Sequence, residues 1–309
     1  MTYGNTASGF EVIEDFGELF GEAAQDGGLE SAEADWEGLL GSRRRRRRIR
    51  QRLDGATEAA ETFTTSGTAA ISTLELRSAV AASTETEFRR WNTAAHILEE
   101  GHDWGKHILK DDYWPAAGIA NATTHFGGTW WSAQAWSAAF VMFCVARART
   151  QLVLPNALLG HPTASNNTAH SAYVWQAHRD RNNRVRQRYW AFLPAQQPLE
   201  VGDIVVRARG TTTPQSARTA MEAATYDSYT SHGDIVTRIT GNDVRVVGGN
   251  VTLPGAVGAD PPGLTVGARG LRIDAHGFLD TAHASANNVF VILKPMGISF
   301  RGSLRGMVL

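Results

Sequence analysis

An apolar stretch, Trp136–Cys144, places the strongest constraint on how this 309-residue chain can fold. It follows a loop rich in Gly and Trp, residues 127–131, and it begins a predicted helix that continues to about Thr150. Apolar residues occupy every side of this helix, which indicates burial inside a domain rather than a place on the surface. The chain must supply a core around it, and a hydrophobic content of 42% with nine Trp is ample for one.

The N-terminal part differs from the rest in its charges. Residues 1–42 carry ten acidic side chains and no Lys or Arg, and residues 43–52 then carry eight Arg. Such blocks repel themselves and resist burial, so we predict a disordered leader over residues 1–52. It is either a tail that binds an export or packaging partner, or a solvated low-complexity segment. Residues 53–75, rich in Ala, Thr, Ser and Gly, are the expected linker to a domain over residues 76–309.

Features that the sequence lacks narrow the location and the partners. No apolar run is long enough to span a bilayer, and no secretory signal is recognisable at the N-terminus. We therefore expect synthesis in the cytoplasm without a membrane span, and any action at the cell envelope requires export by another route. The net charge of −1 argues against nucleic-acid binding by the whole protein, although 27 of its residues are Arg.

The periodicity changes along the chain from helical to extended. Leu76–Lys110 and Ser165–His178 have a helical pattern. Short β-branched segments between turn residues then predict strands at Asp203–Ala208, Asp234–Ile239, Val244–Gly248 and Val289–Leu293. The polar residues 210–230 are expected to form an insertion loop, and residues 251–270, with many Pro and Gly, an irregular excursion. Helices followed by an antiparallel sheet define an α+β domain.

Ser137 is the candidate nucleophile at the start of the apolar helix. A residue in the first helical turn faces unsatisfied backbone N–H groups and the positive end of the helix dipole, which favours a developing anion. A helix end alone does not ionise a Ser hydroxyl, so Ser137 needs a general base within hydrogen-bond reach. The alternative is an ordinary Ser that caps a buried helix. Cys144, the rival nucleophile, lies among apolar residues and is expected to be buried and inert.

His232 and Asn250 are the candidate base and its orienting partner. They lie on predicted strands on either side of a turn at Gly241–Asp243. A three-residue loop would pair Asp234 with Asn250 and put His232 diagonally from Asn250 on one face, within side-chain reach. A two-residue loop would put them on opposite faces unless a bulge restores the register. Asp234 shares a face with His232 and is an alternative orienting residue.

Further side chains are candidates for substrate binding. His170, on a predicted helix, can line the cleft, and a half-buried His with a satisfied hydrogen bond is an equal alternative. Trp131 and Trp136 can form an aromatic wall for sugars or peptide stems, although Trp beside a buried helix also fits plain core.

The sequence contains no pattern for a metal or another cofactor. His96, His102 and His107 are six and five positions apart, which does not match the four-residue spacing of helical metal ligands. The Gly248–Asn250 segment lacks the Lys and the following helix of a phosphate-binding loop. No Gly-x-Ser-x-Gly elbow surrounds any Ser, which argues against an α/β-hydrolase. We expect no cofactor.

In their order along the chain, five motifs resemble a bacterial domain family of unknown function that is similar to the CHAP and NlpC-type peptidoglycan hydrolases. The motifs are Trp136-Ser137-Ala138-Ala139-Phe140, His170-x-x-Tyr173, Val201-Gly202-Asp203-Ile204-Val205, Ser231-His232-Gly233-Asp234-Ile235-Val236 and Gly248-Gly249-Asn250. The resemblance covers about residues 78–300. It implies a papain-like α+β fold, with a buried helix packed on a small antiparallel sheet, and amide-bond chemistry on cell-wall peptide.

Carried over by position, the resemblance implies a triad of Ser137 as nucleophile, His232 as base and Asn250 as orienting residue. The chain departs from the CHAP pattern at Ser137, where those hydrolases have Cys. A thiolate–imidazolium pair is the active species there, and Ser cannot form it at neutral pH. The residues expected to bind substrate are Trp131, Trp136, His170, Tyr173 and Asp234.

Two hypotheses of different class follow. The first is a serine-type peptidoglycan amidase or endopeptidase, in which backbone N–H groups at the helix start stabilise the oxyanion. The alternative is a catalytically inactive module that keeps the cleft and binds cell-wall fragments or a partner protein, as a secreted or injected cargo. A hydrogen bond between the Ser137 hydroxyl and the His232 ring would favour the first.

Overall fold

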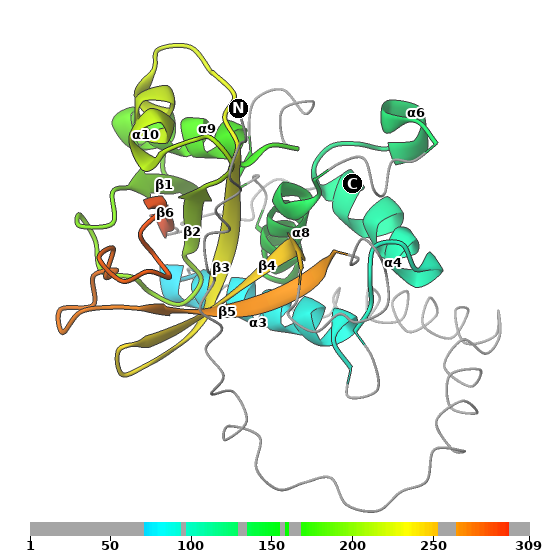
Figure 1. The fold of residues 1–309 in the computed structure, drawn as a ribbon, viewed down its shortest axis with the longest axis horizontal. Coiled ribbons are helices and arrows are strands. Elements are labelled where there is room, and N and C mark those ends of the chain that lie inside the picture. The colour runs from blue at the N-terminus through cyan, green and yellow to red at the C-terminus, as the bar shows by residue number, and fades with distance from the viewer. Residues whose placement is uncertain are drawn as a thin grey trace, which may run out of the picture. The chain divides into compact units, whose positions relative to one another are not determined.

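A computed structural model describes residues 71–93, 97–128, 135–154, 158–160, 168–252 and 264–296 (Figure 1). The chain divides into two compact units, Met1–Gly67 and Thr68–Leu309, and every described residue belongs to the second. The predicted leader and all but the last residues of the predicted linker therefore lie outside the described residues.

Helices dominate the first half of the described chain. The helix α3 (Thr73–Trp91) begins at a capping box, in which the Ser72 and Glu75 side chains each bond the other's backbone N–H. The other helices are α4 (Asp103–Ile108), the π-helix η2 (Leu109–Tyr113), α5 (Trp114–Ala116), α6 (Ala122–Phe126), α8 (Ser137–Gln151), α9 (His170–Asn182) and α10 (Pro214–Glu222).

Six strands form one antiparallel sheet in the order β1-β6-β2-β3-β4-β5. The strands are β1 (Arg188–Phe192), β2 (Ile204–Ala208), β3 (Ser231–Thr240), β4 (Asp243–Val251), β5 (Thr265–Arg272) and β6 (Val289–Met296). Helices first and an antiparallel sheet second confirm the α+β class that the periodicity predicts.

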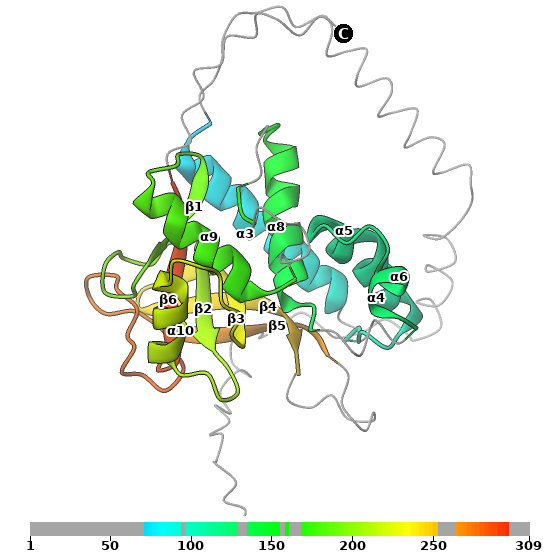
Figure 2. The same cartoon turned by 90° about the horizontal axis from the view of Figure 1, so that it is seen from above.

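Both faces of the sheet are buried. On the helix side, Val206, Ile235 and Val247 join one large core with residues of α3, α8 and α9. Figure 2 shows α3 and α8 lying together on this side of the strands. On the other side, Val205 and Val236 belong to a second core, which the loop residues Leu199, Ile273, Leu279 and Ala286 complete. We call these the helix face and the loop face.

The helix α8 lies within the core of the helix face, as its apolar sequence predicts. Nine of its residues are buried, and Ser137 is the first residue of the helix. Trp136, which precedes it, stacks on Trp91 with ring centroids 5.1 Å apart and lies 5.8 Å from the ring of Tyr113. This aromatic packing holds the start of α8 in one position against α3.

The predicted strands are confirmed, with ends that differ by a few residues, but three elements depart from expectation. The strand β1 was not predicted, and β5 occupies the end of the segment expected to be irregular. The helix α10 lies in the expected insertion loop, where Thr213 caps it and Pro214 occupies its first turn. The helical pattern over Leu76–Lys110 corresponds to α3, α4 and the start of η2.

The turn between β3 and β4 differs from the three-residue loop that the triad favoured. Thr240 pairs with Asp243, so the turn has two residues. Gly241 takes a φ of 58°, which Gly adopts at little steric cost. The register then shifts between Val236 and Arg238, so that Thr237 is the extra residue of a bulge. Such a bulge is the alternative, expected from the sequence, that can restore the register of the two strands when the turn has two residues.

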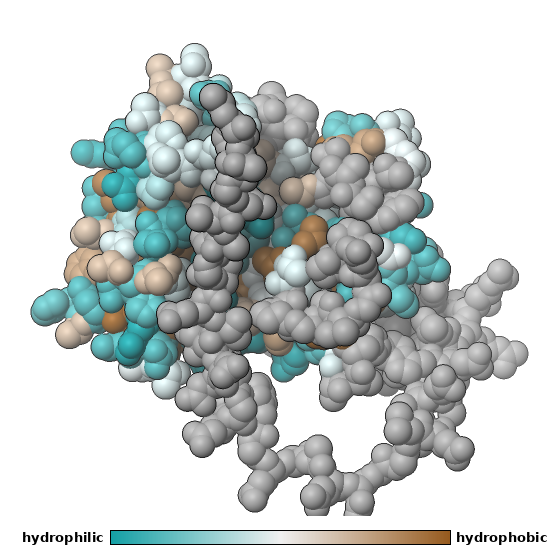
Figure 3. Space-filling view, viewed as in Figure 1, coloured by the Kyte–Doolittle hydropathy of each residue, from teal (hydrophilic) through white to brown (hydrophobic). Residues whose placement is uncertain are grey.

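Large apolar side chains are exposed at only a few described positions: Leu74, Ile97, Trp104, Val153 and Val185. In the view of Figure 3 the described surface is mainly hydrophilic, with small hydrophobic areas between. Within the described residues, none of the helices is long and apolar enough to cross a membrane.

Candidate active site

Ser137 forms its hydrogen bond with His170, the first residue of α9. The Ser137 Oγ lies 2.6 Å from His170 Nε2, and both residues are buried, with 3% and 4% of their surface exposed. The predicted partner was His232. Among the described residues, no hydrogen bond joins Ser137 to His232, so the pairing expected for the triad is corrected to Ser137–His170.

Tyr173 completes the group on the helix face. It lies one turn after His170 on α9, and its hydroxyl forms a hydrogen bond with His170 Nδ1. Gly233 of β3 makes room for both rings, because a Cβ there would lie 2.6 Å from the Tyr173 hydroxyl and 2.8 Å from His170 Nδ1. The side chains of Ser137, His170 and Tyr173 form the group that we call the serine cluster.

Burial decides the protonation of this cluster. It lowers the pKa of His170 well below its usual value, and the neighbouring His232 adds to the effect. Burial also raises the pKa of the Tyr173 hydroxyl well above its usual value. At neutral pH the imidazole is therefore uncharged and the phenol keeps its proton, so His170 has one nitrogen lone pair to offer.

His232 belongs to a different group, on the loop face. Alternation along β3 puts His232 and Asp234 on the side of Val236, whereas Gly233 faces the helices. His232 Nε2 lies 2.9 Å from Asp234 Oδ1, and its Nδ1 lies 3.4 Å from Arg209 Nη1. Because Arg can only donate, Nδ1 accepts and Nε2 carries the proton. Both nitrogens of His232 are thus occupied.

Asp234 is the orienting residue of His232, as the alternative in the sequence predicted. It is buried, and Arg269 donates to its Oδ2 from Nε at 3.0 Å and from Nη2 at 2.7 Å. This bidentate ion pair holds the pKa of the Asp234 carboxyl well below its usual range despite burial. Both Asp234 oxygens contact protein groups, and the expectation that this residue binds substrate stays a prediction.

Asn250 does not orient His232. No hydrogen bond joins the two within the described residues, and the buried Asn250 Oδ1 has no partner there. Asn250 has a φ of 62° and lies where the β4–β5 register is interrupted, between Gly249 and Val251. With this left-handed backbone, the side chain of Asn250 does not follow the alternation of side chains along β4. Asp234, not Asn250, is the residue that orients His232.

The expected aromatic wall is only partly visible. Trp136 has no exposed surface, and its indole N–H donates to Glu100 Oε2 at 2.7 Å, so it is core rather than a substrate platform. Trp131 lies outside the described residues. Cys144 is fully buried and burial raises its thiol pKa, which confirms the prediction of an inert side chain.

Three arginines of the loop face were not singled out from the sequence. Arg207 pairs with His232 across β2 and β3, Arg209 follows β2, and Arg269 lies on β5. The sequence did contain an indication of two of them, in the run Val205-x-Arg207-x-Arg209. Side chains alternate along a strand, so these three residues lie on the same face of the sheet, and two positive charges follow the apolar Val205 on that face.

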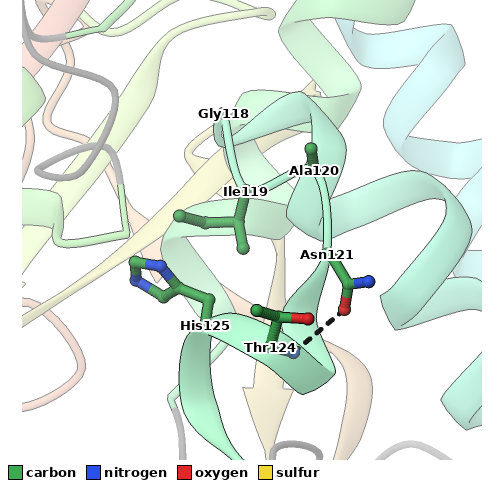
Figure 4. Close-up of a pocket in the computed structure, with 6 residues that line it drawn as sticks. All are labelled: Gly118, Ile119, Ala120, Asn121, Thr124 and His125. Carbon is green, nitrogen blue, oxygen red and sulfur yellow. Dashed lines mark hydrogen bonds between the residues drawn. The ribbon is translucent and has the colours of Figure 1, made fainter.

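The described residues contain no group of three or more His, Cys, Asp or Glu side chains that could hold a metal ion. A surface pocket of about 490 Å³ lies at α6 (Figure 4), and no residue of the serine cluster lines it. Its lining residues are Gly118, Ile119, Ala120, Asn121, Thr124 and His125. Asn121 Oδ1 accepts from the Thr124 backbone N–H there and caps α6.

Comparison with known proteins gives a family but no relative of known function. No curated protein and no solved structure matches the chain. Residues 89–262, more than half of the sequence, match the model of a family described as uncharacterized protein conserved in bacteria (DUF2272). The matched part includes the serine cluster, His232 and Asp234. The chain belongs to this bacterial family, DUF2272.

Proposed function

We propose that the protein is a serine-type hydrolase of amide bonds in cell-wall peptide, with Ser137 as nucleophile and His170 as general base. The observation that carries the proposal is the 2.6 Å contact between Ser137 Oγ and His170 Nε2 at the first residue of α8. A hydroxyl in hydrogen-bond contact with an imidazole, beside the positive end of a helix, is the minimum that nucleophilic catalysis by Ser requires.

In the proposed reaction, Ser137 Oγ attacks the amide carbonyl carbon while its proton moves to His170 Nε2. The protonated ring gives this proton to the leaving amine, the C–N bond breaks and the acyl group stays on Ser137. Water then gives a proton to the same nitrogen and attacks the ester carbonyl carbon. The bond between this carbon and Ser137 Oγ breaks, the protonated ring returns the proton to Ser137 Oγ, and the acid is released. The first N–H groups of α8 have no helical carbonyl partner and can donate to the oxyanion.

Tyr173 can hold His170 in the tautomer that this reaction needs. His170 Nε2 can accept the Ser137 proton only when Nδ1 carries a hydrogen and donates it to the Tyr173 oxygen. A phenol can also donate, which would give the opposite tautomer, with Nε2–H donating to Ser137. Tyr173 is therefore a weaker orienting group than a carboxylate, which can only accept.

The substrate class rests on the resemblance to the CHAP and NlpC-type hydrolases. Two features support a papain-like arrangement: the nucleophile opens a buried helix, and this helix packs against β3 and β4 of an antiparallel sheet. The base departs from that arrangement, because His170 lies on α9, whereas the position carried over from those hydrolases is His232 on β3.

A binding module without catalysis is the second candidate, and burial favours it. With 3% of Ser137 and 4% of His170 exposed, their hydrogen bond also fits a satisfied polar pair inside the core. In such a module the domain would bind cell-wall fragments or a partner protein without turnover.

Digestion of purified peptidoglycan separates the two candidates. The full chain and the Ser137→Ala and His170→Gln variants are compared by chromatography of the released fragments, with Ser83→Ala as a control that removes a buried hydroxyl from α3. We expect product from wild type and from the control but not from the two cluster variants. Equal product from wild type and Ser137→Ala would refute the proposal.

A further inference from the structure

We propose that Arg207 and Arg209 form a binding site for a carboxylate group beside the serine cluster. That this carboxylate belongs to the hydrolysed peptide rests on the proposed function, whereas the binding site itself does not.

The charged side chains around His232 on the loop face do not balance one another. They include three guanidinium groups, from Arg207, Arg209 and Arg269, but their one carboxylate is that of Asp234. Asp234 is already matched by the bidentate pair with Arg269. Within the described residues, the only carboxylate near Arg207 is the same Asp234 oxygen, 3.8 Å from its Nε, and no ion pair is formed by Arg209. Two positive charges thus lack a partner of their own.

Hydrogen-bond donors of these two arginines are also unused. Arg207 Nε is buried and has no hydrogen-bond partner among the described residues. Burial lowers the pKa of Arg207 to about 10. Asp234 opposes this effect, and the neighbouring Arg269 and Arg209 add to it. Arg209 Nη1 makes one long side-chain contact within the described residues, 3.4 Å to His232 Nδ1. A buried donor without an acceptor is costly, so an added anion would be stabilising.

The position of this pair suits recognition of a substrate. Arg207 lies directly opposite His232 across β2 and β3, and the His232 ring centroid is 5.6 Å from that of His170. One imidazole ring therefore separates the arginines from the proposed base. Arg209 is exposed and the Arg207 side chain keeps 23% of its surface exposed, so an anion can approach from solvent.

The planar guanidinium fork fits the two oxygens of a carboxylate, and a phosphate presents the same oxygen geometry. For an amide hydrolase, the fitting group is a free carboxylate next to the scissile bond. Binding at Arg207 and Arg209 would make the enzyme select peptides with such a group over amidated ones.

The test measures binding by calorimetry to the full-length Ser137→Ala chain, so that no turnover interferes. The probes are N-acetyl-alanyl-alanine, its C-terminal amide and inorganic phosphate. We expect the acid to bind at least about tenfold more tightly than the amide, a preference that Arg207→Gln and Arg209→Gln each reduce to below about threefold. Arg238→Gln, which changes an exposed arginine further along β3, should keep the full preference.

Equal affinity for acid and amide, including no detectable binding of either, would overturn the site. Phosphate binding that depends on Arg209, without a preference for the acid, would overturn the carboxylate assignment. A second measurement, hydrolysis of the free and the amidated peptide by the wild-type chain, distinguishes a failure of the site from a failure of the proposed function. If the chain binds the acid more tightly than the amide but hydrolyses neither, only the proposed function is contradicted. If the chain hydrolyses free and amidated peptides equally well, and Arg209→Gln does not change this, only the carboxylate site is contradicted.

Discussion

The two buried histidines of this protein lie close together but have opposite surroundings. His170, on the helix face, contacts two neutral hydroxyls, those of Ser137 and Tyr173. His232, on the loop face, contacts two charged groups, those of Asp234 and Arg209. Burial lowers the pKa of both rings, so the difference lies in their partners rather than in their depth.

These partners decide which ring can move a proton. A hydroxyl can donate or accept, so either tautomer of His170 satisfies its neighbours and a proton can pass through the ring. The carboxylate of Asp234 accepts and the guanidinium of Arg209 donates, so a single tautomer of His232 satisfies both. His170 is suited to general base chemistry, and His232 is suited to holding β3 and its charges in place.

The strongest way to break this comparison is the same substitution at both histidines. Gln keeps one donor and one acceptor but cannot take a proton. We expect His170→Gln to reduce kcat on peptidoglycan fragments by at least about 10³-fold, because both the base and the acid are lost. His232→Gln can still accept from Arg209 and donate to Asp234, so kcat should fall by less than about tenfold. Losses of equal size would show that His232 takes part in proton transfer.

Removing the charge of Asp234 tests the loop face through stability. Asp234→Asn removes the buried carboxylate that pairs with the half-buried Arg269, and the expected loss is about 3–5 kcal/mol in the free energy of unfolding, measured by urea denaturation. Asp243→Asn is the control, because this carboxylate is 80% exposed and its pair with Arg272 is 3.7 Å long. It should cost less than about 1 kcal/mol. Similar losses in both variants would contradict the buried charge network.

The pH dependence gives a second measurement on Asp234. Its pKa in the folded protein lies well below the usual value, so its contribution to stability is present above the pKa of the unfolded chain. This contribution is lost as the pH falls through the folded pKa. The difference in stability between wild type and Asp234→Asn should therefore shrink on acidification below about pH 4. A constant difference down to acid unfolding would argue against the ion pair.

Two glycines allow each face to be disturbed alone. A Cβ at Gly233 would collide with the serine cluster, and a Cβ at Gly248 would lie 2.9 Å from His232 Nε2 and collide with Asp234. Each Gly→Ala change should cost about 1–3 kcal/mol by overpacking. Gly233→Ala should also lower kcat strongly, whereas Gly248→Ala should leave kcat within a fewfold of wild type once both are folded. The reverse order would exchange the roles of the two histidines.

Much of the fold could be predicted from local patterns. The apolar sequence of α8 and the β-branched runs of β2, β3, β4 and β6 indicate these elements directly. The strand β5 contains Gly267 and Gly270, which read as loop, and only pairing with β4 makes it a strand. The helix α10 was missed although Thr213 and Pro214 are a recognisable helix start.

The site was harder to predict because both faces of the sheet are apolar. Ile235 and Val236 are both buried, so the sequence of β3 does not reveal which face carries His232. The pairing of Ser137 with His170 depends on how α9 docks against β3, which no local pattern specifies. The three-residue spacing of His170 and Tyr173 on one side of a helix was visible, and it could have marked them as a pair.

A moderate loss of activity is expected from Tyr173→Phe, which removes one hydroxyl and keeps the ring. His170 Nδ1–H then has no acceptor, the Nε2–H tautomer becomes more favourable, and kcat should fall by about tenfold. Because His170 acts in its neutral form and its pKa is well below the usual value, the wild-type rate should stay constant from pH 8 to about pH 6.5 and decline only at lower pH. Burial, the main cause of that low pKa, is unchanged in Tyr173→Phe, so the plateau should keep its shape at a lower height. A variant with lower stability but an unchanged plateau would mean that Tyr173 only fills the core. Its hydrogen bond to His170 would then have no part in orienting the base.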